Sequence, residues 1–390
     1  VPGFATKLVR LVRDEEEADG PAEFAGVRAE AGSRIVLDNG ILQLGLDPLT
    51  GRIVSLRRID GNGPSRDLVP PREELLEWLY VPGRDPETAQ SAGAGSVEVT
   101  DAGPLVWRAV VRREAPGTRD GITTTIRLVE GSDRIEFEVR FDKERTLEPE
   151  AVLLRFPAAI ASGSAVRVIG GAWSPCEAET GQAPGANRNY YTVERWADVH
   201  DRAGGFTLVS VDAPLVQLGS TGTDPIVAGW RERVDPAPVL YSYLMNNYWE
   251  SNYRAEQEGP HAIRYVLRPH LGFEVSSAER LGLESAHPLL AYRVRTDLPQ
   301  LEPPVVVEAE HAVVSLLRRT ADSLELRLFN PSGHSDTVGI SVPGRPRAAP
   351  VRAGFWGPGV GGDASAEKAL VVRPGEILTV RIPLAQASDS

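Results

Sequence analysis

The amino-acid sequence predicts an all-β fold built mainly from antiparallel strands. Short runs alternate apolar and polar residues, which is the period of a strand with one face on a core and the other in solvent. Turn residues separate almost all of these runs. The strand-helix alternation that marks a parallel sheet is absent. With 390 residues, the chain is long enough to bury a large core.

The first predicted element is a meander of three strands over residues 34–58. Residues 38–40, Asp-Asn-Gly, form a hairpin turn after the first apolar run. Residues 42–46 then alternate leucine with other side chains, and residues 47–51, Asp-Pro-Leu-Thr-Gly, form the second turn before the third strand.

The clearest single strand is predicted at residues 134–141, where four apolar side chains fall on one face and four charged ones on the other. Helical patterns occur only at residues 72–80 and 276–292. Further strands are predicted at residues 105–112, 122–129, 151–156, 206–211, 239–244, 263–267, 305–310, 324–329 and 377–382.

A proline-broken segment at residues 296–304 divides the predicted fold. It separates a large β domain at residues 31–295 from a small β domain at residues 305–390, where short strands resume at close spacing. Residues 1–30 are expected to lead in from an upstream region. The chain begins Val-Pro-Gly and its only methionine is Met245, so residue 1 is expected to be a cleavage point or a cut within a longer protein.

Composition argues against several partners. The 42 basic and 54 acidic residues give a net charge of −12, so nucleic acid and anionic membranes, which require clustered Lys and Arg, are not expected to bind. The single cysteine, Cys176, cannot form an intramolecular disulfide, which is compatible with a cytoplasmic location. No run approaches 18 uninterrupted apolar residues, so no membrane anchor is expected.

The residues themselves identify no catalytic side chain and no metal ligand. Catalytic metal sites need three or four ligands, often introduced by close histidine pairs. The six histidines are instead scattered, at positions 200, 261, 270, 287, 311 and 334. Residues 357–362 match the glycine-rich dinucleotide fingerprint, but that motif works only between a strand and a helix, so a loop is expected there.

Residues 241–253 are the most unusual segment of the chain, with five aromatic residues and three asparagines in 13 positions. A pyranose packs its C–H face on a flat ring, and its hydroxyls pair with amide groups, so the segment suits a saccharide. The alternative is a strand whose tyrosines cap the core. The candidate carbohydrate-binding residues are Asn246, Asn247, Tyr248, Trp249 and Tyr253.

Several stretches, taken in order, resemble the C-terminal β region of glycoside hydrolase family 38, the α-mannosidase family. They begin with Val-Pro-Gly-Phe-Ala-Thr-Lys at residues 1–7 and the hairpin at residues 37–56, Leu-Asp-Asn-Gly to Ile-Val-Ser-Leu. The remaining stretches lie at residues 189–199, 205–210, 212–215, 316–320, 326–331 and 373–380.

This resemblance implies a large galactose-mutarotase-like supersandwich followed by a small β-sandwich. In the family, the zinc ligands and the aspartate nucleophile lie on an N-terminal α/β barrel, and no segment here resembles that barrel. The resemblance therefore implies a non-catalytic accessory half without a cofactor, whose partners are its own missing catalytic barrel and a saccharide. The position of Asn246, Asn247 and Tyr248 resembles a loop that the β region lends to the rim of the sugar site.

Two other functions remain open. The same sheet architecture could carry an autonomous aldose epimerase or lyase-like enzyme, which needs a histidine and a carboxylate converging in a concave face. His261 and Glu258 are the nearest such candidates in the sequence. The third hypothesis is a purely structural β module.

Overall fold

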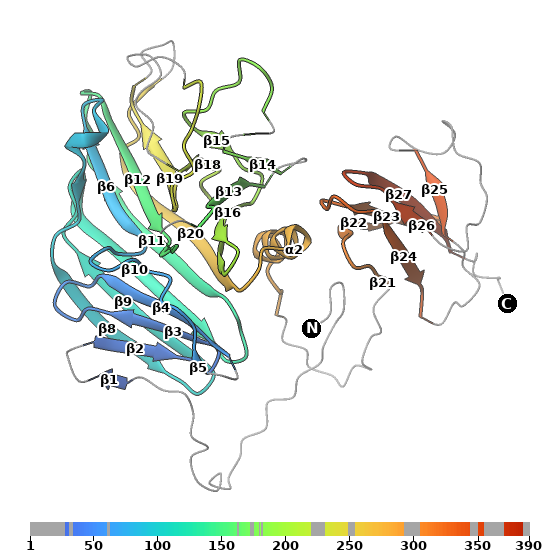
Figure 1. The fold of residues 1–390 in the computed structure, drawn as a ribbon, viewed down its shortest axis with the longest axis horizontal. Helices are drawn as coiled ribbons and strands as arrows, with labels where there is room; N and C mark the ends of the chain where they lie inside the picture. Colours follow the sequence, from blue (N-terminus) through green and yellow to red (C-terminus); the bar gives the residue numbers. More distant parts are fainter. Residues whose placement is uncertain are drawn as a thin grey trace, which may run out of the picture. The chain divides into compact units, whose positions relative to one another are not determined.

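The protein was analysed as a computed structural model, which describes residues 28–30, 34–60, 63–161, 164–171, 175–178, 180, 182–219, 231–248, 254–291, 305–343, 350–354 and 370–384. The chain divides into two compact units, with the boundary between Phe273 and Glu274 (Figure 1). The segment predicted as a linker, residues 296–304, lies outside the described residues, as does the glycine-rich segment at residues 357–362.

The unit that ends at Phe273 contains three antiparallel sheets. The five-stranded sheet comprises β1 (Arg28–Glu30), β2 (Arg34–Asp38), β3 (Leu42–Leu46), β4 (Ile53–Asp60) and β5 (Gly63–Pro64), in that order. The nine-stranded sheet has the order β14 (Cys176–Glu177), β13 (Arg167–Gly170), β16 (Trp196–Asp201), β17 (Gly204–Ser210), β20 (Gly259–His270), β11 (Ile135–Lys143), β10 (Thr118–Val129), β9 (Val106–Arg113) and β8 (Gly95–Ala102). The six-stranded sheet has the order β15 (Tyr191–Thr192), β18 (Leu215–Leu218), β19 (Val239–Asn246), β12 (Glu150–Pro157), β6 (Glu77–Pro82) and β7 (Gln90–Ser91), and a 3₁₀ turn, η1 (Pro86–Thr88), precedes β7.

One hydrophobic core joins the three sheets of this unit. Strand β11 turns Phe137 and Val139 into the core and its charged residues outward, as the alternation predicts. The core also takes Leu44 from the five-stranded sheet and Phe156 from the six-stranded sheet. The predicted strands are therefore present, with their ends shifted by a few residues.

The predicted meander is confirmed as β2, β3 and β4. Asn39 fixes its first turn, because its Oδ1 accepts hydrogen bonds from the N–H groups of Ile41 and Leu42 at 3.1 and 2.8 Å. The Nδ2 of Asn39 donates to the carbonyl oxygens of Val129 and Ser132 at 2.7 and 2.9 Å. One buried amide thus ties this hairpin to the turn between β10 and β11.

The helix predicted at residues 72–80 is wrong. Arg72 and Leu76 have φ of 68° and 63°, in the left-handed region that no α-helix uses. Residues 77–82 instead form β6, which pairs with β12. Trp78 enters the main core while Val81 packs in a second cluster on the other face of the sheet. Because both faces of β6 are buried, its sequence lacks the alternation that would have predicted a strand.

The C-terminal unit begins with the helix predicted at residues 276–292, which is confirmed as α2 (Val275–Ala286) but is shorter. Glu274 caps it by accepting a hydrogen bond from the N–H of Ser277 at 3.0 Å. His287 ends it, and Pro288 follows. Because proline cannot donate the backbone hydrogen bond of a continuing helix, the helix stops before residue 288.

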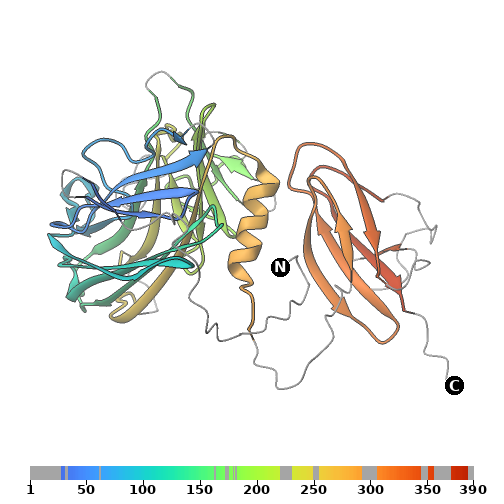
Figure 2. The same ribbon diagram turned by 90° about the horizontal axis from the view of Figure 1, so that it is seen from below.

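The rest of the C-terminal unit is a small β-sandwich (Figure 2). Its core includes Leu326 and Val380 from one sheet and Val338 and Val372 from the other. One sheet has the order β21 (Val306–Glu308), β24 (Asp336–Ser341) and β26 (Leu370–Val372), and the other β22 (Val313–Arg319), β23 (Ser323–Phe329), β27 (Ile377–Pro383) and β25 (Val351–Ala353). The predicted all-β fold, with a large β domain followed by a small sandwich, is confirmed.

Among the described residues, none of the helices has both the length and the hydropathy that crossing a membrane requires.

Candidate functional site

The candidate carbohydrate-binding residues begin with Asn246 at the end of β19, and the side chain of the next residue, Asn247, is used within the fold. Asn247 is buried, and its Oδ1 accepts a hydrogen bond from the N–H of Glu150 at 2.5 Å. Its Nδ2 donates to the carbonyl oxygens of Thr146 and Glu148 at 3.3 and 2.5 Å. The amide therefore uses its acceptor and its donors on the loop that leads into β12.

Tyr248 is buried as well, in a cluster with Tyr241 and Tyr243 on the face of the six-stranded sheet turned away from the main core. Arg84 donates to the carbonyl oxygen of Tyr248 at 2.9 Å, and its guanidinium lies 5.1 Å from the centre of the tyrosine ring. Tyr241 and Tyr243 thus pack in a buried cluster on the sheet, as expected for the alternative in which the tyrosines of this segment cap the core.

Asn246 differs from its neighbours because it is only half-buried. Its Oδ1 accepts a hydrogen bond from the N–H of Tyr248 at 3.1 Å, and no partner of its Nδ2 lies among the described residues. Trp249 and Tyr253 lie outside the described residues. That this segment binds a saccharide stays a prediction.

His261 and Glu258, the candidates of the epimerase hypothesis, each contact other groups. The Nε2 of His261 lies 3.3 Å from the carbonyl oxygen of Gln257, and its ring stacks on Phe141 with centres 5.2 Å apart. The carboxylate of Glu258 forms an ion pair with Arg254. The described contacts of His261 and Glu258 are thus with other residues and do not pair the two side chains.

Two histidines that are far apart in the sequence meet at one buried carboxylate. Asp198 is fully buried, and its Oδ1 lies 2.7 Å from the Nδ1 of His200. Its Oδ2 lies 3.0 Å from the Nε2 of His270 and accepts a hydrogen bond from the hydroxyl of Thr207 at 2.5 Å. The His200 ring stacks on Phe273, with centres 4.7 Å apart. The cluster joins β16, β17 and β20, and no periodicity in the sequence could have brought these residues together.

Burial alone would raise the pKa of the Asp198 carboxyl. Hydrogen bonds from His200, His270 and Thr207 to the ionised form outweigh burial and hold that pKa below its ordinary value of 3.8. The carboxylate therefore stays charged and holds three strands together.

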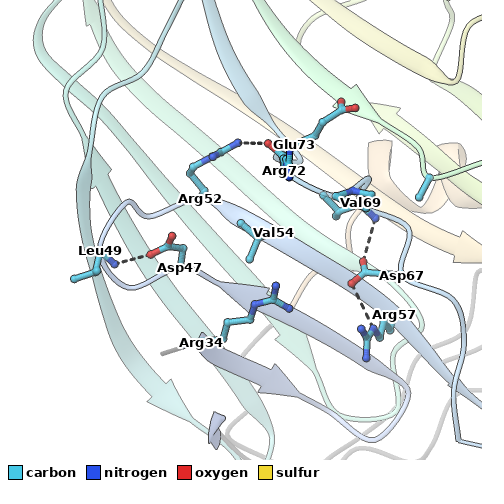
Figure 3. Close-up of a pocket in the computed structure, with 12 residues that line it drawn as sticks. Arg34, Asp47, Leu49, Arg52, Val54, Arg57, Asp67, Val69, Arg72 and Glu73 are labelled. Carbon is cyan, nitrogen blue, oxygen red and sulfur yellow. Dashed lines mark hydrogen bonds and ion pairs between the residues drawn. The ribbon is translucent and has the colours of Figure 1, made fainter. Parts of the chain in front are cut away.

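A cavity of about 730 Å³ lies on the face of the five-stranded sheet turned away from the core (Figure 3). The opposite face of the sheet carries the core leucines of β3. The apolar part of the wall includes Leu49, Val54 and Val69. Its charged residues are four arginines and three acids: Arg34, Arg52, Arg57, Arg72, Asp47, Asp67 and Glu73.

The acids around this cavity are held by neighbouring groups. Asp67 accepts hydrogen bonds from the hydroxyl of Ser55 at 2.5 Å and the N–H of Leu56 at 2.9 Å, and lies 3.4 Å from the Nε of Arg57. Asp47 accepts from the N–H of Leu49 at 2.8 Å and thereby forms its own turn. These contacts hold both carboxylates in the wall of the cavity (Figure 3).

The described residues hold no group of three or more His, Cys, Asp or Glu side chains arranged to bind a metal ion.

Residues 37–213, a little under half of the chain, match the family model "Glycosyl hydrolases family 38 C-terminal domain". This region is a glycoside hydrolase family 38 C-terminal domain. No curated protein sequence matches the chain.

Two solved structures are similar in fold to nearly the whole chain, beyond the region that the family model matches. An α-mannosidase from Enterococcus faecalis V583 aligns with a TM-score of 0.66 at 13% identity, covering 95% of this chain and 44% of that one. A protein of glycosyl hydrolase family 38 from Enterococcus faecalis aligns with the same score and identity, covering 95% of this chain and 46% of that one. The chain thus spans less than half the length of these structures and shares the fold of that part.

A galactose mutarotase related enzyme from Lactobacillus acidophilus aligns with a TM-score of 0.33 at 8% identity, covering 61% of this chain and 97% of that one.

Proposed function

We propose that this chain is the non-catalytic accessory half of an α-mannosidase-like glycoside hydrolase. The observation that carries this proposal is the match to an α-mannosidase over 95% of this chain but only 44% of that enzyme. More than half of that enzyme has no counterpart here. Its catalytic machinery is proposed to lie in that other half.

The proposed division of labour follows from the chemistry. Glycoside hydrolysis needs a nucleophile or an activated water together with a proton donor at the scissile bond. In this proposal a catalytic barrel, the main partner of the chain, supplies the nucleophile and holds the zinc, which orients and polarises the sugar. The chain itself holds no cofactor and acts in the cytoplasm on a saccharide, without nucleic acid or membrane partners.

Asn246, the last residue of β19, and the residues that follow it supply the proposed saccharide contacts. Asn246 has the amide donor that can reach a sugar hydroxyl, because its Oδ1 is used within the turn while its Nδ2 has no described partner. Asn247 and Tyr248 are then positioning residues that fix this turn against β12 and Arg84. Trp249 and Tyr253 complete the proposed rim.

The test compares two polypeptides in hydrolysis of an aryl α-mannoside, each with and without added zinc. One is this 390-residue chain, and the other is the product of the gene together with its upstream coding region. The proposal expects turnover only by the extended product. Turnover at an enzyme-like rate by the pure chain would overturn the accessory role, and an inactive extended product would overturn the α-mannosidase assignment.

The alternative epimerase activity is measured on the same preparation. An aldose whose anomers are equilibrated faster in the presence of the chain, with a loss on His261→Gln, would favour that alternative instead. The described contacts of His261 and Glu258 do not favour it.

A further inference from the structure

The cavity on the five-stranded sheet carries positive charge that the described chain does not neutralise. Arg52 pairs with Glu74 through a 2.8 Å contact of its Nε. Arg57 lies against Asp67, and Glu73 forms an ion pair with Arg155 of β12. Two arginines of the cavity wall remain after these pairs are assigned.

Those two residues are Arg34 and Arg72. Neither guanidinium has a hydrogen-bonded or ion-paired partner among the side chains that the structure describes, which exclude those of residues 28–30 in the neighbouring strand, and both arginines are exposed. They reach the cavity from different elements, Arg34 from β2 and Arg72 from the segment between β5 and β6 (Figure 3). A guanidinium presents a planar fork of donors that matches carboxylate and phosphate oxygens.

We propose that this cavity is a binding site for a monosaccharide-sized polar molecule that carries a carboxylate or a phosphate. Arg34 and Arg72 bind the anionic group, and Asp47 accepts hydrogen bonds from hydroxyls. The volume of about 730 Å³ lies within the range of small-molecule sites. Val54 and Leu49 offer an apolar surface to the C–H groups of such a ligand. The site does not depend on the proposed accessory function.

The backbone at Arg72 supports the assignment independently. Its φ of 68° lies in the left-handed region, which is unfavourable for a residue with a side chain and which glycine adopts freely. Strained residues of this kind persist only where their surroundings hold them, and they cluster at binding sites.

The surroundings of Arg72 do hold it. The next residue, Glu73, pairs with Arg155. Glu74, which is 2% exposed, pairs with both Arg52 and Arg113, at 2.8 and 3.0 Å. The Nη2 of Arg52 also donates to the carbonyl oxygen of Arg72 at 3.1 Å. Arg113 of β9, Arg155 of β12 and Arg52, the residue before β4, thus fix the backbone that presents Arg72 at the cavity.

The experiment measures binding to the 390-residue chain by titration calorimetry in a buffer of low ionic strength. The probes are glucuronate, inorganic phosphate and glucose, each tested up to 20 mM. Glucuronate is expected to bind at least about tenfold more tightly than glucose and to lose affinity when salt is added, because salt screens partly exposed charges.

The phosphate arm distinguishes the two sources of the anionic group. If phosphate displaces glucuronate, the site accepts either anion, and if phosphate fails to bind, the ligand is a carboxylate; both results support the site. Failure of both anions to bind, or glucose binding as tightly as glucuronate, would overturn the proposal.

Variants locate the binding. Arg34→Gln and Arg72→Gln are each expected to weaken glucuronate binding about tenfold, the loss of one charge-assisted hydrogen bond. The matched control is Arg112→Gln, which removes the same charge from an exposed arginine of β9 outside the cavity and should bind as the parent does. Equal weakening in all three variants would show a general charge effect and overturn the site.

A further variant, Arg72→Gly, separates the site from a structural role. It is expected to lose glucuronate binding as Arg72→Gln does, while its melting temperature rises by about 2 °C, because glycine relieves the left-handed backbone. A lower melting temperature would show that Arg72 supports the fold, and would overturn its assignment to a ligand.

Discussion

Asn247 illustrates how a residue suited to sugar recognition can be required by the fold. Each polar atom of its buried amide meets a backbone group near the start of β12. A ligand would have to compete with those bonds. Asn246, the preceding residue, makes a single described bond within its own turn. The two neighbours therefore differ in what substitution should do.

Asn247→Ala should lower the free energy of unfolding by about 3 kcal/mol, since it leaves buried backbone groups of the loop before β12 without partners. Asn246→Ala, the matched control, should cost less than about 1 kcal/mol. Urea unfolding of the two variants measures both values. Similar losses in the two variants would contradict the structural role given to Asn247.

Asp198→Asn should destabilise the protein by about 2 kcal/mol at pH 7, because a neutral amide binds His200, His270 and Thr207 less well than a carboxylate. The folded-state pKa of Asp198 is depressed, so the stability it contributes is complete above the ordinary value of 3.8 and is lost as the pH falls through the lower folded value. The difference in unfolding free energy between parent and variant should therefore persist at pH 5 and shrink only below about pH 4. A difference that shrinks already between pH 7 and pH 5 would mean that another group controls the cluster.

At the scale of the element, an irregularity in β10 depends on a single glycine. The pairing of β10 with β11 shifts register between Thr118 and Ile122. Gly121, inside that shift, has φ of 78°, and a Cβ there would lie 2.1 Å from the carbonyl oxygen of Arg113. Gly131, in the turn after the same strand, has φ of 67° but open space around its Cβ position.

Gly121→Ala should therefore cost about 3 kcal/mol of unfolding free energy or more, because the methyl group collides with the backbone of β9 in addition to straining its own backbone. Gly131→Ala should cost only the backbone strain, about 1 kcal/mol. Chemical unfolding of both variants gives the comparison. Equal costs would show that the close approach to β9 relaxes without penalty.

The elements also show which parts of the fold the sequence can predict. Strands with one buried face, such as β11, were predicted because their side chains alternate. The sequence of β6 was interpreted as a helix because both faces of this strand are buried, so its side chains do not alternate. The left-handed backbone of Arg72 and Leu76, just before the strand, cannot be predicted from any local sequence pattern. The two-residue strands β14 and β15 are too short to carry a period.

At the scale of the whole molecule, the resemblance to the family could be predicted from the sequence because the resembling stretches occur in order along the chain. Residues 37–213 match the family model. The cavity could not be predicted from the sequence, because its wall is assembled from β2, β4 and the segment before β6, which only the pairing of strands brings together. The one available signal was local, five arginines between residues 52 and 72. A count of charges cannot say which of them are paired.

Zinc gives a test of the proposed division between this chain and a catalytic barrel. An ion that binds only the folded state raises stability by RT ln(1 + [L]/Kd), which is about 2.7 kcal/mol at a hundredfold excess over Kd and moves the melting temperature by several degrees. Since the proposal assigns all zinc ligands to the barrel, the melting temperature of the 390-residue chain should be the same with 100 μM zinc as with a chelator. The extended product that includes the upstream region should instead melt several degrees lower in the chelator. A chelator-reversible rise in the chain alone would contradict the division, because it would require a folded zinc site within these 390 residues.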